Sequence, residues 1–195
     1  MNKIFFLILF FSISCKSQDG EYKINYYIFP FKESEGHIRN NLKEGTWKYY
    51  DPDGTIKSII TYSKGIEDGH YQAYYENGKL SSDAYIKNGN FVGFVRNYYQ
   101  SGNINSEEYY DEHSLMQGKF RLWFESGKLM QVGIRLNGKI IGDCILYYEN
   151  GKIKENRFYD SLGNRDSIWK SYSIKGDLIK EEKYKADSLI LEEVK

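Results

Sequence analysis

Two series of glycines recur along the chain at an almost constant interval, and this period limits the possible folds more than any other feature of the sequence. The first series advances in steps of 24 or 25 residues through Gly54, Gly78, Gly102, Gly127, Gly151 and Gly176. The second keeps the same steps through Gly45, Gly69, Gly93, Gly118 and Gly142, and Ser167 takes the sixth place. A repeat of this length predicts tandem structural units, each packing on its neighbours. We interpret residues 43–187 as six such units.

The apolar residues keep the same register as the glycines. Two residues after the second series stand Trp47, Tyr71, Val95, Phe120, Cys144 and Trp169, and two residues after the first stand Ile56, Leu80, Ile104, Leu129, Ile153 and Leu178. Between these two arms, pairs such as Asn77-Gly78 are typical of tight hairpin turns, in which glycine supplies a positive φ. Each unit is therefore predicted to be a strand, a turn and a strand, which makes the fold all-β.

One unit, residues 69–80 with the sequence Gly-His-Tyr-Gln-Ala-Tyr-Tyr-Glu-Asn-Gly-Lys-Leu, resembles the bacterial variant of the MORN repeat. Proteins built of this variant are often labelled YwqK-family antitoxins. The resemblance implies an elongated, open antiparallel sheet of successive hairpins, and it implies binding or scaffolding rather than catalysis. The last unit departs from the pattern at Ser167 and Ser173, and the first unit departs at Asp51.

The two ends of the repeat array are expected to be atypical because terminal repeats must cap the stack. Residues 20–42 are predicted to form an N-terminal cap, since Tyr26 and Tyr27 stand 24 residues ahead of Tyr50 and Asp51. Residues 188–195 are predicted to form a C-terminal capping strand, whose charged residues would discourage pairing at an exposed edge.

The first residues are typical of a bacterial lipoprotein signal. Lys3 precedes an unbroken apolar run from Ile4 to Phe11, and Cys15 follows small residues. We expect residues 1–14 to be a signal peptide, Cys15 to carry lipid, and residues 15–19 to be a tether. The chain would then be a lipid-anchored protein of the cell envelope, at the outer membrane or facing the periplasm. The alternative is a plain secretory signal with Cys15 incidental.

Strand alternation sorts the first arm of each unit into two columns. The column of Trp47 and Phe120 is predicted to be packed, which makes Cys144 a core residue. The other column places the cations Arg96 and Arg121 beside a ladder of rings, which comprises Tyr50, Tyr74, Tyr98, Trp123, Tyr147 and Tyr172. This ladder is a candidate binding surface, although packing of one unit on the next explains the rings equally well.

Several functions are disfavoured by the sequence. Lys plus Arg and Asp plus Glu are 27 each, so the chain has no net charge to hold a nucleic acid. The three histidines, His37, His70 and His113, have no metal-ligand spacing, so no metal site is expected. We find no nucleophile motif, no converging pair of carboxylates and no phosphate loop, so neither catalysis nor a cofactor is expected.

Three functional hypotheses follow from these features. The first is a non-enzymatic scaffold at the cell envelope that binds a protein or peptide, which in the antitoxin version is a toxin. The second is a glycan-binding surface protein that stacks sugars on the Tyr and Trp rings. The third is direct contact with the membrane.

Overall fold

The computed structural model describes residues 14–17 and 20–195, and these fall into two units. Unit 1 ends at Gly89, and unit 2 spans Asn90–Lys195. The predicted signal peptide lies outside the described residues except for Ser14. The predicted tether contains the short strand β1 (Ser14–Ser17), whereas residues 18 and 19 also lie outside the described part.

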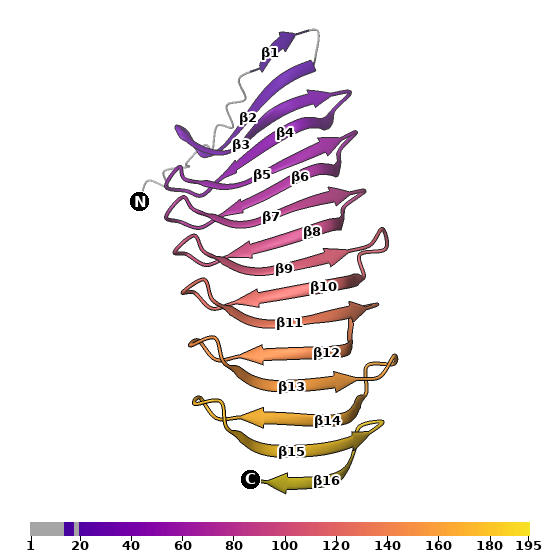
Figure 1. Ribbon diagram of the computed structural model, residues 1–195. Helices are drawn as coiled ribbons and strands as arrows, with labels where there is room; N and C mark the ends of the chain where they lie inside the picture. Colours follow the sequence, from indigo (N-terminus) through magenta and orange to yellow (C-terminus); the bar gives the residue numbers. More distant parts are fainter. Residues whose placement is uncertain (1–13, 18–19) are drawn as a thin grey trace, which may run out of the picture. The chain divides into compact units, whose positions relative to one another are not determined.

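Unit 1 is an antiparallel sheet in which each strand pairs with the next one along the chain (Figure 1). Its strands after β1 are β2 (Gly20–Ile28), β3 (Phe31–Arg39), β4 (Leu42–Tyr50), β5 (Ile56–Ser63), β6 (Ile66–Tyr74) and β7 (Leu80–Lys87). The predicted N-terminal cap therefore contains β2 and β3, and β3 pairs with the first strand of the repeats.

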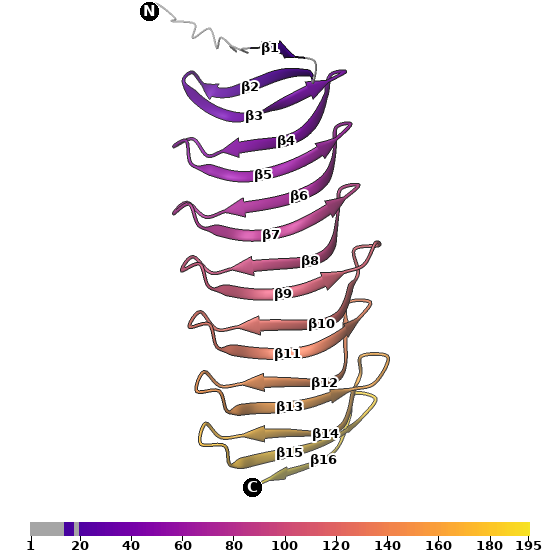
Figure 2. The ribbon, with the colours of Figure 1, turned by 45° about the horizontal axis from the view of Figure 1, so that its top comes forward.

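Unit 2 continues the same pattern of consecutive antiparallel pairs, drawn from magenta to yellow in Figure 2. Its strands are β8 (Asn90–Tyr98), β9 (Ile104–Tyr110), β10 (Met116–Trp123), β11 (Leu129–Leu136), β12 (Lys139–Tyr147), β13 (Ile153–Tyr159), β14 (Arg165–Tyr172), β15 (Leu178–Lys185) and β16 (Ser188–Val194). The described residues contain no helix. The prediction of an all-β, open antiparallel sheet of successive hairpins is confirmed.

The first glycine series closes the hairpin turns. In the turn after β6, the Gly78 N–H donates to the Tyr75 carbonyl and the Tyr75 N–H donates to the Lys79 carbonyl, both at 2.8 Å. Gly78 has a φ of 76°, which side chains rarely adopt, so its missing Cβ lets the chain reverse without strain. This is the three-residue hairpin loop that ends in a left-handed residue.

The second glycine series lies inside the strands and produces a bulge in each repeat. Tyr109 pairs with Gln117 and Glu107 pairs with Arg121, so residues 118–120 together oppose Glu108 alone. Gly118 begins this bulge with a φ of 70°, and Ser167 occupies the equivalent position of the last repeat with a φ of 59°. The bulge was not predicted, because it is a property of two paired strands rather than of one.

One face of the sheet, which we call the packed face, carries the buried column predicted from the sequence. Trp47, Phe120 and Cys144 are essentially inaccessible, Val95 is buried, and Tyr71 and Trp169 are half-buried. Glycines on the neighbouring strand make room for the large rings. A Cβ on Gly36 would stand 2.5 Å from the Trp47 ring, and one on Gly133 would stand 2.8 Å from the Phe120 ring.

The opposite face, which we call the ladder face, carries the residues that alternate with the packed column. In unit 2 the central row of this face starts at Arg96, Glu107 and Arg121, which pair with one another across β8, β9 and β10. The row continues through Val132 and Ile145 on β11 and β12. Side chains of this face therefore lie in rows that run across the strands.

Candidate binding surfaces

The ladder residues close the first strand of every repeat. Each is the last residue of its strand, each is half-buried, and each pairs across the hairpin with an apolar residue. The pairs are Tyr50–Ile56, Tyr74–Leu80, Tyr98–Ile104, Trp123–Leu129, Tyr147–Ile153 and Tyr172–Leu178. The ladder thus contributes to packing within each hairpin, and part of each ring stays accessible.

The residue after the ladder position explains why aromatic residues come in doublets. The Tyr99 hydroxyl donates to the main-chain carbonyl of Trp123 at 2.7 Å, and the Tyr148 hydroxyl donates to that of Tyr172 at 2.8 Å. Tyr27 makes the same bond to the carbonyl of Tyr50 at 2.9 Å. The second ring of the doublet therefore links consecutive repeats, which is a structural role.

The two arginines predicted beside the ladder share one carboxylate. Arg96 and Arg121 each donate to Glu107 at 2.9 Å, one to each carboxylate oxygen. Glu107 has a side chain that is only 15% exposed, whereas each arginine is about 40% exposed. The arrangement holds both guanidinium groups at the surface with one net positive charge.

A row of exposed apolar side chains lies next to this central row in unit 2, and it was not among the predicted site residues. Its most exposed members are Phe94, Ile168, Ile134 and Tyr109, at 50%, 49%, 46% and 41%, and Phe158 follows at 37%. The Phe94 and Tyr109 rings meet edge to face with centroids 5.3 Å apart. Phe94 and Ile168 each lie in the middle of a bulge. Tyr109, Ile134 and Phe158 each pair with a residue in the middle of a bulge. We call them the apolar row.

The apolar row borders a shallow hollow of about 360 Å³ over β10, β11 and β12. Its walls are the side chains of Val132, Ile134 and Ile145, with Lys119 and Asp143 at its two sides. The bulge glycine Gly118 forms part of its floor, and a Cβ there would meet no atom within 4 Å. The hollow is therefore an apolar site flanked by one charge of each sign.

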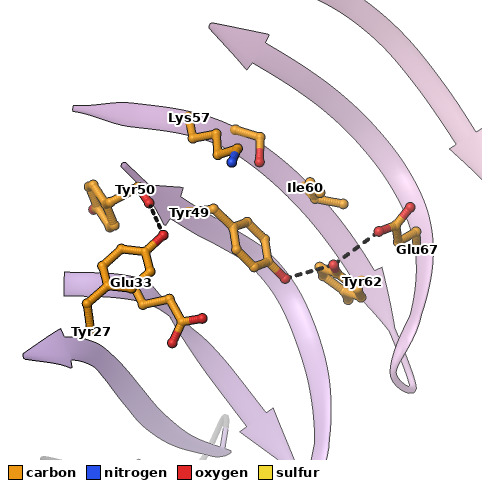
Figure 3. Close-up of a pocket in the computed structure, with 9 residues that line it drawn as sticks. Tyr27, Glu33, Tyr49, Tyr50, Lys57, Ile60, Tyr62 and Glu67 are labelled. Carbon is orange, nitrogen blue, oxygen red and sulfur yellow. Dashed lines mark hydrogen bonds between the residues drawn. The ribbon is translucent and has the colours of Figure 1, made fainter. Parts of the chain in front are cut away.

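A second cavity of about 310 Å³ lies in unit 1, where four tyrosines and two glutamates gather (Figure 3). Lys43 donates to the Tyr49 hydroxyl at 2.5 Å, the hydroxyls of Tyr49 and Tyr62 lie 2.8 Å apart, and Tyr62 donates to Glu67 at 3.2 Å. Burial, together with Tyr49 and Glu67, raises the pKa of Tyr62, so its hydroxyl keeps its proton. Glu33 and Lys57 also line this cavity.

Beside this cavity, the Glu35 carboxylate on the ladder face collects hydrogen bonds from Lys32 at 2.7 Å and from the Tyr50 hydroxyl. Burial alone would raise the pKa of Glu35, but the bonds from Lys32 and Tyr50 outweigh it and lower the pKa. Burial and the same carboxylate raise the pKa of Tyr50. The first ladder residue is therefore fixed as a neutral donor to an ionised acid.

The described residues hold no cluster of three or more histidine, cysteine, aspartate or glutamate side chains able to bind a metal ion. His70 and His113 lie near the single carboxylates of Asp83 and Glu112, each at 3.8 Å. Cys144 is a free, buried thiol whose pKa is raised by burial, although Gln131 donates to its sulfur at 3.1 Å. In the part of the chain that the structure describes, no helix is long and apolar enough to span a membrane.

Comparison with known proteins finds similarity in part of the repeat array. No curated protein matches the chain. The crystal structure of TcdB2-TccC3-Cdc42 is similar at 10% sequence identity with a TM-score of 0.18. That match covers 86% of this chain and 13% of that chain, so this chain spans a small part of its length. Residues 43–64, 67–88, 93–112 and 140–161 match the family model of the MORN repeat variant, so four segments of the chain are similar to that repeat.

Proposed function

We propose that this protein is a non-enzymatic scaffold of the bacterial cell envelope that binds a protein or peptide partner through the ladder face of unit 2. The observation that carries the proposal is the apolar row, in which five large side chains stand exposed on β8, β9, β11, β13 and β14, with the charged Lys119 and Asp143 on the strands between them. Exposed apolar side chains that gather on one face among polar residues are a mark of an interaction surface, whereas single exposed apolar residues are ordinary. The arginines beside the row add the residue type that interfaces favour.

Capture of partners from solubilised envelopes tests this proposal. The bait is the wild-type chain, and the variant bait carries Phe158→Ser and Ile168→Ser in the apolar row. A control carries Leu162→Ser and Ile174→Ser, which change two apolar residues outside the row that are more exposed than Phe158 and Ile168. We expect wild type and control to capture the same protein and the row variant to lose it. Equal capture by all three baits would contradict a binding role for the row.

Anchoring by lipid on Cys15 is the second part of the proposal, and it rests on the signal-like residues 1–14. A Cys15→Ala variant should leave the membrane fraction, because the attached lipid would be the main source of membrane affinity. A variant that still cofractionates with membranes would instead support direct contact between the sheet and lipid. In the antitoxin version of the proposal the captured protein would be a toxin, and neighbouring genes that encode one would favour it.

Binding of a glycan is the alternative, and the cavity of unit 1 favours it. Tyrosine rings beside glutamate carboxylates offer faces for a sugar ring and acceptors for its hydroxyls. Trp47 reports on this cavity, since its ring centroid lies 6.5 Å from those of Tyr49 and Tyr62. Oligosaccharides or cell-wall fragments should change Trp fluorescence if the cavity binds them, and a Tyr62→Phe variant should respond less. An unchanged emission spectrum would count against the glycan alternative.

A further inference from the structure

The apolar row of unit 2 is arranged symmetrically about strand β11. Ile134 stands at the centre of the row. One strand away on either side lie Lys119 on β10 and Asp143 on β12, and two strands away lie Tyr109 and Phe158. The sequence of side chains across the sheet therefore reads aromatic, cation, isoleucine, anion, aromatic. The two flanking charges are opposite in sign, and each lies one strand from β11. Lys119 pairs directly with Ile134, whereas Asp143 lies in the bulge that follows Ile141, the partner of Ile134 on β12.

We propose that the partner of this face is a second copy of the same chain, packed face to face about a two-fold axis parallel to β11. This inference rests on the proposed function, since it identifies the protein that the apolar row binds. Two sheets that pack through their faces lie about 10 Å apart with their strands nearly aligned. A symmetric pair of this kind is the commonest form of homo-oligomer.

The two-fold axis brings β10 of one copy opposite β12 of the other. Lys119 then faces Asp143 of the second copy, and Asp143 faces Lys119 of the second copy, so one axis creates two complementary contacts. Neither side chain forms an ion pair with another residue in the described part of the chain, so both charges are available for these contacts. Tyr109 likewise faces Phe158, which pairs ring with ring.

The side chains in the neighbouring rows of the ladder face are also compatible with this two-fold axis. Trp123 on β10 comes opposite Tyr147 on β12, and Arg121 comes opposite Ile145, whose hollow can accept its stem. Arg96 and Lys170 are brought together three strands from the axis, but each already pairs with a carboxylate of its own sheet. These are Glu107 at 2.9 Å and Glu181 at 3.2 Å. No unpaired like charges therefore oppose the contact.

Charge reversal at the two flanking positions tests the symmetry itself. Each protein carries Cys15→Ala, so that no lipid is present, and its mass is measured in solution from micromolar to millimolar concentration. Wild type should have twice the mass of one chain at high concentration. Lys119→Asp alone and Asp143→Lys alone should each be monomeric, because each places two pairs of like charges across the axis. The double variant should dimerise again, and so should an equimolar mixture of the two single variants.

The control is Lys128→Asp, which reverses an exposed charge in a hairpin turn outside the face and should leave the dimer intact. Circular dichroism of every variant checks that the sheet is folded. A monomeric wild type at all concentrations would overturn the inference, as would single variants that stay dimeric or a mixture that stays monomeric. Capture of another protein by such a monomer would leave the proposed function standing. A dimer that captures nothing else would support the inference alone.

Discussion

The two units are similar on one face of the sheet and different on the other. On the packed face they are alike, since Trp47 in unit 1 and Phe120 in unit 2 are equally buried, each over a glycine of the neighbouring strand. On the ladder face they diverge. The positions equivalent to the apolar row in unit 1 hold Thr46, Thr61 and His70, which are polar, and Tyr85, whose ring is 48% exposed, so unit 1 has one exposed ring where unit 2 has several large apolar side chains.

This difference indicates which face the repeat architecture constrains. A side chain on the packed face must fit its neighbours in the next strand, so every repeat keeps an apolar or aromatic residue there, although its size ranges from Cys144 to Trp47. The exposed side chains of the ladder face contact mainly solvent, and their replacement changes the free energy of unfolding little. The ladder face can therefore acquire a patch specific to this protein without loss of the fold. Substitutions in the two units and on the two faces test whether the faces are constrained independently.

Replacement of a phenylalanine on each face should give the largest contrast. Phe120→Ser removes a ring that is 1% exposed and should lower the free energy of unfolding by roughly 3 to 5 kcal/mol. Phe94→Ser removes a ring that is half exposed and should cost less than about 1 kcal/mol. Chemical denaturation of the two variants measures the difference. If Phe94→Ser were the more damaging change, the assignment of faces would be reversed.

Filling the space over a packed ring should have the next largest effect, and it should be similar in both units. Gly36→Ala and Gly133→Ala each place a methyl group under 3 Å from a buried ring, which must move. We expect each to cost about 1 to 3 kcal/mol, as overpacking usually does. A large cost in one unit and none in the other, by thermal denaturation, would show that the packed faces are not equivalent.

Hairpin turns should respond to a side chain at the glycine and much less to loss of a neighbouring charge. Gly151 has a φ of 85° and an open space where a Cβ would stand, so Gly151→Val acts through backbone strain alone. We expect a cost of more than about 1 kcal/mol. Lys152→Ala in the same turn should cost much less, although its ammonium group donates to the Lys175 carbonyl. Equal costs would contradict the role of the glycine.

Ser167→Gly should stabilise the protein, because Ser167 adopts the positive φ that glycine supplies in the other bulges. The expected gain in the free energy of unfolding is about 0.5 to 1 kcal/mol, and the matched change Ser173→Gly, outside the bulge, should give none. A loss of stability in the Ser167→Gly variant would mean that the hydrogen bond between the Ser167 N–H and Asp166, at 2.5 Å, depends on the serine.

The last prediction concerns acid stability and is specific to unit 1. Because the pKa of Glu35 is lowered in the folded protein, its contribution is complete above the unfolded pKa, about 4.3, and is lost as pH falls through the folded value. The free energy of unfolding of the Glu35→Gln variant, measured at neutral pH and near pH 3, should therefore change less with pH than that of wild type. If the variant and wild type showed the same pH dependence, Glu35 would not contribute to the loss of stability in acid.

The period, the hairpin turns and the buried column follow from the amino-acid sequence alone. Each of these depends on residues close together in one arm, since a turn needs its own glycine and a strand alternates its side chains with a period of two. The positive φ of Gly78 and the burial of Phe120 therefore follow from the local pattern of their own repeats.

The positions of the rows across the strands follow from the pairing of the strands in the folded protein. The bulge at Gly118 sets three residues against Glu108, and the register of the following strands pairs Lys119 with Ile134 and Asp143 with Phe158. No single arm contains that information, because the register between strands depends on hydrogen bonds between residues far apart in sequence. The same holds for Gly36, which is required by the Trp47 ring of the next strand. Local pattern specifies which side chains a strand presents, whereas pairing specifies which of them become neighbours.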